Sequence, residues 1–250
     1  DWKKTNNVTA IFKNGDKKDP SNYRPISLTS VICKLIETII RGKIVNHLED
    51  NSLILNSQHG FRRGRSCLTN LIEFFQKVIN IHDDGDPVDI VYLDFKKAFD
   101  KVPHERLMAK LKAHGIGGEV ANWVKDWLSN RTQRVTVDGA ASKWRGVCSG
   151  VPQGSVLGPV LFILYINDLD LEIKSIISKF ADDTKLAGKV TTIEDREQIK
   201  RDLIKLMEWA DKWQMSFNVD KCKVMHIGSR NPKEEYTMLN GLLKQANEEK

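Results

Sequence analysis

The sequence lacks the features that would point to a secreted, metal-stapled or membrane protein. Its four cysteines, Cys33, Cys67, Cys148 and Cys222, lie far apart, form no CxxC pair and have no histidine at a zinc-site spacing. This cysteine usage favours a reduced, intracellular protein. The longest apolar run, residues 160–166, is far shorter than the about 20 residues that cross a bilayer. The first residues also show no signal-peptide pattern, and the chain has no internal repeat or low-complexity tract.

What the chain does have is enough apolar sequence for a core and a modest positive charge. It has 250 residues, of which 40% are hydrophobic and 29% charged, so one large domain or two smaller ones are expected. Its 39 Lys and Arg against 33 Asp and Glu give a net charge of +6. Residues 1–85 hold 13 of these cations and 9 of the anions, a local balance of +4. Such a field favours a polyanion, nucleic acid included, without selecting one. Because the sequence begins without Met, we expect it to be a fragment.

Hydrophobic periodicity predicts alternating helices and strands. The helices are expected at residues 29–48, 67–81, 103–115, 119–128, 152–169 and 193–215. The strands are expected at residues 8–12, 88–95, 132–137, 142–148, 176–181, 184–187 and 223–227. In the first helix the apolar stripe consists of Ile32, Leu35, Ile36, Ile39, Ile40 and Ile44. From residue 88 this order predicts an α/β (α+β) fold, with helices on one face of a mainly antiparallel sheet. Beyond Gly228 a charged tail is expected.

Three aspartates follow or interrupt apolar strand sequences. Asp182 and Asp183 form a tight turn between two strands, and Asp94 ends the buried strand VDIVYLD. Adjacent carboxylates repel each other, and a divalent cation offsets that repulsion. Three carboxylates in one place would suit two Mg²⁺ ions about 4 Å apart, as in phosphoryl transfer. A solvated turn at Asp182 and Asp183 is the alternative, since 88 residues separate the turn from Asp94.

Two loops and two further residues allow either a structural or a functional interpretation. The loop 149–155, SGVPQGS, is either a helix start or a bare backbone against which a flat ligand lies, with Gln153 offering an amide. The loop 58–66, QHGFRRGRS, is either a solvated basic loop or a phosphate site built from three arginines. Phe99 on its own is most simply a core residue, and Asp100 most simply caps the next helix.

Taken together and in order, these segments resemble the reverse transcriptase domain of non-LTR (LINE-type, jockey-like) retrotransposons. The segments that carry the resemblance are WKKTNNVTAIFKNGDKKDPSNYRPISLTSVICKLIE, QHGFRRGRS, VYLDFKKAFDKVPHERL, GVPQGSVLGPVLFILYINDL, FADDTKL and FNVDKCKVM. They run over nearly the whole chain. The resemblance implies the right-hand polymerase fold, with fingers at 1–87, palm at 88–228 including inserted helices, and a tail at 229–250. The thumb that follows in the family would be missing.

The resemblance also implies roles for individual residues. Catalysis would fall to Asp94, Asp182, Asp183 and Lys221, with Lys223 as the fallback for the lysine that approaches pyrophosphate. The metal ligands would be the three aspartates together with the backbone of Phe95. Phe99 would be the steric gate beneath the sugar. The remaining nucleotide or template contacts would be Arg24, Arg62, Arg65, Pro152, Gln153, Gly154 and Ser155.

The implied activity is RNA-directed DNA polymerisation, in which dNTPs are added to a primer 3′-hydroxyl with two Mg²⁺ ions, or Mn²⁺ in their place. The implied partners are an RNA template, a DNA primer and dNTPs, with no membrane. The cytoplasm and nucleus are the compartments expected for the family. Two alternatives stay open: a truncated, inactive retroelement fragment that only binds nucleic acid, and another palm polymerase, including RNA-dependent RNA polymerases. Phe99 and the FADD sequence argue against the latter.

Overall fold

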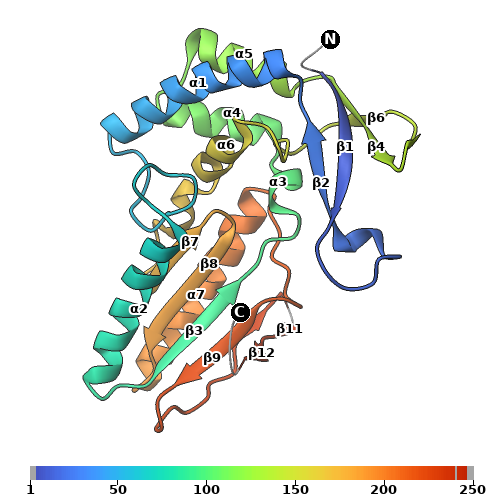
Figure 1. Cartoon of the computed structure of the whole chain (residues 1–250). Coiled ribbons are helices and arrows are strands. Elements are labelled where there is room, and N and C mark those ends of the chain that lie inside the picture. Colours follow the sequence, from blue (N-terminus) through green and yellow to red (C-terminus); the bar gives the residue numbers. More distant parts are fainter. Residues whose placement is uncertain (1–3, 240, 247–250) are drawn as a thin grey trace. The chain divides into compact units, whose positions relative to one another are not determined.

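The chain folds into two compact units, each built from two stretches of sequence (Figure 1). The computed structural model describes residues 4–239 and 241–246. The first unit comprises Asp1–Ile54 and Phe99–Tyr165, and the second Leu55–Ala98 and Ile166–Lys250. These boundaries differ from the expected segments 1–87, 88–228 and 229–250. Over the described ranges, no helix combines the length and the apolar character needed to span a membrane.

The first unit combines a small sheet with four helices. Its sheet has the order β2-β1-β4-β5, and β6 also pairs with β4. The strands are β1 (Thr5–Phe12), β2 (Tyr23–Leu28), β4 (Arg131–Val137), β5 (Ala140–Ala141) and β6 (Arg145–Val147). The helices are α1 (Val31–Asp50), α4 (His104–Ala113), α5 (Gly118–Leu128) and α6 (Gly158–Tyr165), with a 3₁₀ turn at Pro20–Asn22. The short helix α3 (Ala98–Lys101) lies where the chain passes between the units.

Helix α1 buries only part of the apolar stripe that the sequence predicts to face the core. Ile32, Leu35 and Ile39 are 58%, 62% and 67% exposed. The buried face instead includes Glu37, whose Oε2 accepts hydrogen bonds from the backbone N–H groups of Val156 (2.7 Å) and Leu157 (3.1 Å). These N–H groups precede α6 and have no partner within that helix, so a carboxylate is favoured there. The predicted stripe was therefore wrong for Ile32, Leu35 and Ile39, whereas Ile44 is buried and the helix itself is confirmed.

Two other local predictions for the first unit were also wrong. The helix expected over 152–169 is limited to α6 and a separate 3₁₀ turn, Asn167–Asp170. Asp100 does not cap α4; it lies inside α3, and the N-cap position of α4 is Pro103, which makes no side-chain cap. The hairpin around Asp138-Gly139 is confirmed, and both residues have positive φ, as the favoured two-residue turn requires.

The second unit is a mixed sheet with a helix on each face. The strand order is β12-β9-β3-β8-β7, and all neighbours are antiparallel except β12 and β9. The strands are β3 (Val88–Leu93), β7 (Ile176–Phe180), β8 (Asp183–Lys189), β9 (Lys223–Ile227) and β12 (Lys244–Gln245). A separate ribbon pairs β10 (Thr237–Met238) with β11 (Gly241–Leu242). The helices are α2 (Cys67–Asp83) and α7 (Ile193–Lys212).

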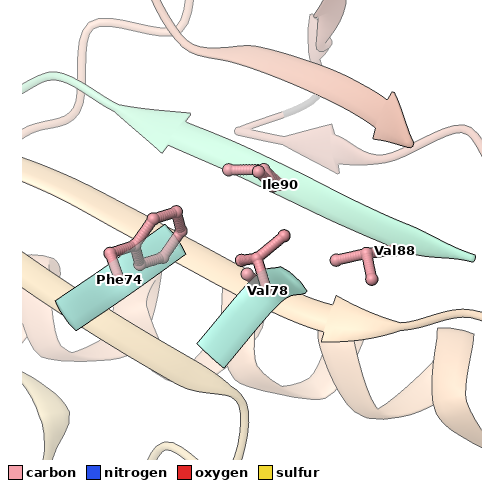
Figure 2. Close-up of a cluster of buried hydrophobic side chains, with 5 residues drawn as sticks. Phe74, Val78, Val88 and Ile90 are labelled. Atoms are coloured by element: carbon pink, nitrogen blue, oxygen red, sulfur yellow. The ribbon is translucent and has the colours of Figure 1, made fainter. Parts of the chain in front are cut away.

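Helices α2 and α7 cover opposite faces of this sheet, not one face as expected. Phe74 and Val78 of α2 form a buried cluster with Val88, Ile90 and Ala187 (Figure 2). The next residue of β8, Gly188, faces the other way. A Cβ at Gly188 would lie 3.2 Å from the side chain of Ile199 in α7. The central strand β3 is consequently covered on both faces, which explains why its sequence is hydrophobic at every position except Asp89.

The described part of the segment after Gly228 is packed against the sheet and is not a charged tail. The phenol of Tyr236, fully buried, donates to Asp89 Oδ2 at 2.7 Å. Burial, then the neighbouring Asp89 carboxylate, raises the pKa of Tyr236. His226 and Asn231 also contact Asp89 Oδ1, each at 2.7 Å. A buried carboxylate needs such partners, so this segment is required for the stability of β3.

The α2 cluster generates a stability prediction. Phe74→Ala removes a ring that is 1% exposed, so it should lower the free energy of unfolding by about 3–5 kcal/mol. Ile72→Ala, on the same helix but 59% exposed, should change it by less than about 0.5 kcal/mol. Urea denaturation followed by circular dichroism measures both. Equal effects of the two substitutions would contradict this packing of α2.

Candidate active site

The three aspartates lie at the same end of two neighbouring strands. Strands β3 and β8 pair in a register that ends with Leu93 opposite Thr184. The next step in that register brings Asp94 opposite Asp183. The β7–β8 hairpin closes with the pair Phe180–Asp183, so Ala181 and Asp182 form its two-residue loop. Asp94 thus follows β3 at the same end of the sheet at which Asp182 precedes β8 and Asp183 begins it, although 88 residues separate Asp94 from Asp182 in sequence.

The backbone beside Asp94 also directs a carbonyl group toward this end of the sheet. Phe95 forms an antiparallel bridge with Phe217. The hydrogen bonds of this bridge are made by the residues on either side of Phe95 and Phe217. Lys96 N donates to Ser216 O and Asn218 N donates to Asp94 O, both at 2.7 Å. Because peptide groups alternate in direction along a strand, the carbonyl of Phe95 faces the β8 side. The Phe95 ring is buried and stacks on Phe217, with 4.4 Å between centroids.

Asp94 has a cationic partner. Lys221 Nζ lies 3.1 Å from Asp94 Oδ2, and its side chain is 61% exposed. Across residues 4–239 and 241–246, no three His, Cys, Asp or Glu side chains are arranged to hold a metal ion. The donor chemistry nevertheless suits Mg²⁺, because carboxylate and carbonyl oxygens are its preferred protein ligands. These oxygen ligands and the positions of their backbone suit a divalent cation. For the ion to bind Asp94, the Lys221 ammonium has to move away from that carboxylate.

The arginines of the loop 58–66 make hydrogen bonds to their own unit. Arg62 donates to the carbonyl of Leu55 at 3.1 Å. Arg65 lies 3.0 Å from Glu73 Oε2 and 3.3 Å from His59 Nε2. Burial, followed by the Arg65 charge, lowers the pKa of His59, whose Nδ1 lies 2.9 Å from Thr69 Oγ1 and whose Nε2 lies 3.3 Å from Glu73 Oε2. Arg62 and Arg65 therefore stabilise the loop, whatever else they contact. Arg24 lies exposed on β2 in the first unit.

Phe99 and the loop 149–155 belong to the first unit. The Phe99 ring stacks on Phe162 at 4.4 Å between centroids, and its carbonyl accepts from Val151 N at 2.8 Å. Ser155 Oγ donates to Pro152 O and accepts from Gly158 N, which caps the start of α6. The carbonyl of Gln153 accepts from Ser27 N at 2.7 Å and joins the loop to β2.

Two glycines of this loop lie so close to other backbone segments of the chain that no side chain fits there. Gly150 and Gly154 both have positive φ, 87° and 98°. A Cβ at Gly150 would lie 2.6 Å from Asp100 O, and one at Gly154 would lie 2.7 Å from Ser27 O. Close backbone packing therefore accounts for both glycines without a ligand. Gly154 and the half-buried Gln153 side chain remain accessible on this loop, whereas Pro152 and Ser155 are buried.

Sequence reasoning missed Gln58 as a residue of the aspartate turn. Its buried side-chain amide bonds to both the N–H and the C=O of Ala181, the residue before Asp182. In the sequence Gln58 only opens an arginine-rich loop, so the arginines drew attention instead. The adjacent glycine in QHG was the available signal, because glycine often marks a close approach of two backbones.

Comparisons with known proteins identify the family to which this fold, with its acidic strand ends, belongs. The family model described as reverse transcriptase (RNA-dependent DNA polymerase) matches residues 15–244. The chain belongs to this reverse transcriptase family.

Among curated proteins, the chain is similar to transposon polymerases of flies. It is 32% identical over 221 residues to the probable RNA-directed DNA polymerase from transposon X-element of Drosophila melanogaster, covering 86% of this chain and 24% of that protein. It is 29% identical over 252 residues to the RNA-directed DNA polymerase from mobile element jockey of the same species, covering 97% and 27%. The chain thus spans about a quarter of the length of these relatives.

Among solved structures, the fold is similar to that of telomerase. Apo telomerase from Candida tropicalis, truncated from its C-terminal domain, superposes with a TM-score of 0.64 at 11% identity, covering 94% of this chain and 52% of that one. At this identity the likeness concerns the fold alone. It identifies the fold as the right-hand polymerase type.

The Lys221–Asp94 ion pair predicts competition with metal. Lys221→Gln should tighten Mn²⁺ binding by about two- to fivefold, because a cation that occupies Asp94 is removed and an exposed pair contributes about 0.2–1 kcal/mol. Lys223→Gln, which makes the same charge change on β9, is the matched control and should have a smaller effect. Titration of the chain with Mn²⁺, followed by electron paramagnetic resonance, measures both affinities. If both substitutions tighten Mn²⁺ binding equally, the tighter binding comes from the lower net positive charge, and Lys221 has no specific role.

Proposed function

We propose that this chain is the fingers-and-palm part of an RNA-directed DNA polymerase of a jockey-like non-LTR retrotransposon. The observation that supports the proposal most directly is the β3–β8 register, by which Asp94 and the Asp182–Asp183 turn lie at the same end of the sheet in a chain of the reverse transcriptase family. As segments, residues 1–87 are proposed as fingers and 88–228 as palm with inserted helices.

The proposed roles follow from where each residue lies. Asp94, Asp182 and the Phe95 carbonyl would hold two divalent cations, with Asp183 as a second carboxylate in the turn. Bound there, the cations would supply Lewis acidity, lowering the pKa of a primer 3′-hydroxyl and neutralising the β- and γ-phosphates. Lys221 would leave Asp94 and turn its exposed ammonium toward the departing pyrophosphate. The 3.1 Å ion pair with Asp94 favours Lys221 over Lys223 for this role.

The first unit would supply the contacts that select and orient the nucleotide. Phe99 would act as the steric gate against a 2′-hydroxyl. Gln153 and Gly154 are accessible for nucleotide or template, and Pro152 and Ser155 would shape the loop from below. Arg24 would contact phosphate directly. Arg62 and Arg65 would contact phosphate in addition to the bonds that they make to Leu55 and Glu73.

The partners proposed are an RNA template, a DNA primer and dNTPs, with Mg²⁺ or Mn²⁺ as cofactor. Base pairing with the template would select the nucleotide, while basic residues neutralise phosphates and make binding salt-dependent. The cytoplasm and nucleus are the proposed compartments. A nucleic-acid-binding fragment without catalysis is the competing function that the following experiment separates.

Primer extension tests the catalytic proposal. With the chain fused to the thumb region of a jockey relative, a DNA primer should be extended on an RNA template with Mg²⁺. Asp182→Ala and Asp94→Asn should each lower kcat by more than about 10²-fold, because the lost charge stabilisation amounts to several kcal/mol. Asp211→Asn, an exposed acid in α7, is the control that keeps activity. Extension that survives either site substitution would refute the ligand assignment, and nucleic-acid binding without any extension would favour the inactive fragment.

Phe99→Val tests the steric gate. Shortening the side chain should raise ribonucleotide incorporation relative to deoxynucleotide by about tenfold or more, since it opens space beneath the sugar. Phe162→Val removes the other ring of the same stack and controls for lost packing. The ratio of kcat/KM for the two nucleotides is the measurement. If both variants change that ratio alike, Phe99 is a core residue and not a gate.

A further inference from the structure

The loop that carries Asp182 has an unfavourable backbone conformation. Ala181, the first residue of the two-residue β7–β8 loop, has φ of 55°. A residue with a Cβ adopts this left-handed conformation only at a cost, and glycine usually occupies this position of a hairpin loop. Ala181 is also 6% exposed, so water does not readily satisfy its peptide groups. Other groups in the protein must therefore bond to the peptide groups of Ala181 and stabilise this conformation.

Gln58 bonds to both peptide groups of Ala181. Its Oε1 accepts from Ala181 N at 2.9 Å, and its Nε2 donates to Ala181 O at 3.2 Å. The same Oε1 accepts from Gly60 N at 2.7 Å. Gln58 itself is fully buried. Its amide therefore replaces the two backbone hydrogen bonds that a neighbouring strand would otherwise provide at this position.

The segment around Gln58 is fixed to the hairpin by its backbone. Lys179 N donates to Ser57 O at 2.7 Å, and His59 N donates to Lys179 O at 2.9 Å, so residues 57–59 pair with β7 in parallel. Gly60 then passes so close to the loop that a Cβ there would lie 2.3 Å from Ala181 N. No side chain fits at that distance, so residue 60 must be glycine for the amide to reach Ala181.

We propose that Gln58 is a positioning residue of the metal site, which holds Ala181 in the left-handed conformation and thereby fixes where Asp182 and Asp183 present their carboxylates. This inference rests on the proposed function for the statement that these carboxylates bind metal. Without the Gln58 amide, the buried N–H and C=O of Ala181 lose their partners. The loop then relaxes toward negative φ, and the direction of Asp182 changes with it.

Metal binding by the chain tests this role. Gln58→Ala should weaken Mn²⁺ binding, titrated by electron paramagnetic resonance, by about tenfold, a typical loss when a group that orients a ligand is removed. In a chain that already carries Ala181→Gly, Gln58→Ala should weaken Mn²⁺ binding by only about threefold, because glycine adopts positive φ without strain. The difference between the two losses is the coupling expected if Gln58 acts through the backbone of residue 181.

A matched control separates positioning from general stability. Asn70 in α2 is also a buried amide that bonds to the same hairpin: it donates to Ser178 Oγ (2.7 Å) and Lys179 O (3.1 Å), and neither bond involves Ala181. Asn70→Ala should lower the melting temperature without the coupling to residue 181. The inference is overturned if Gln58→Ala weakens Mn²⁺ binding by the same factor in the unmodified chain and in the Ala181→Gly background. It is also overturned if the effect of Asn70→Ala on Mn²⁺ binding depends on residue 181 in the same way.

A second readout separates this inference from the proposed function. Hydrogen exchange of the Ala181 amide needs no metal, and it should be slow in the unmodified chain and at least about tenfold faster after Gln58→Ala. If the unmodified chain binds no Mn²⁺ while this protection behaves as expected, the metal-site proposal fails and Gln58 still orders the turn. An Ala181 amide that Gln58→Ala leaves equally protected overturns the role of Gln58 itself.

Discussion

The pairing of β3 with β8 is the constraint on which the candidate site depends. Side chains alternate between the two faces of a sheet, so a shift of one residue would move Asp94 and Asp183 to opposite faces. Both faces of this sheet are covered by helices, and each face needs its own apolar set. Ala187 packs beneath α2 while Gly188 makes room for Ile199 of α7. The requirement to bury two cores therefore fixes the register that brings the carboxylates together.

Buried polar side chains serve the backbone throughout the molecule. Glu37 accepts the N–H groups ahead of α6, and Asp202 in α7 accepts those of Lys174 and Ser175. Gln58 does the same for Ala181 and Gly60. In each case a loop or helix start leaves peptide groups away from water, where an unpaired group costs about 1–3 kcal/mol. These side chains hold irregular backbone in one conformation, which regular strand pairing cannot do.

This pattern explains which parts of the structure could be predicted from the sequence. Periodicity located β3, α2, α7 and β9 because their burial is apolar and regular. It misjudged part of α1, since Ile32, Leu35 and Ile39 were expected to face the core and are exposed, while the periodicity gave no sign that Glu37 is buried. The position of Asp94 and the FADD turn was predicted from strand ends and family resemblance together. Gln58 was not, because a side chain that bonds to a distant backbone leaves no periodic signal in its own segment.

The two halves of the proposed chemistry are stabilised in different ways. The aspartate turn is held within the second unit, where Gln58 fixes Ala181 and Lys221 neutralises Asp94. The loop around Gln153 is held within the first unit, by Ser27 and by the short approaches of Gly150 and Gly154 to backbone. In both loops a residue with positive φ is held by contacts with residues that are distant in the sequence. Such conformations persist only where the surrounding structure determines them, and they concentrate at functional sites. At Ala181 the conformation coincides with a buried amide that bonds to both of its peptide groups, and this combination ties the geometry of the aspartate turn to Gln58.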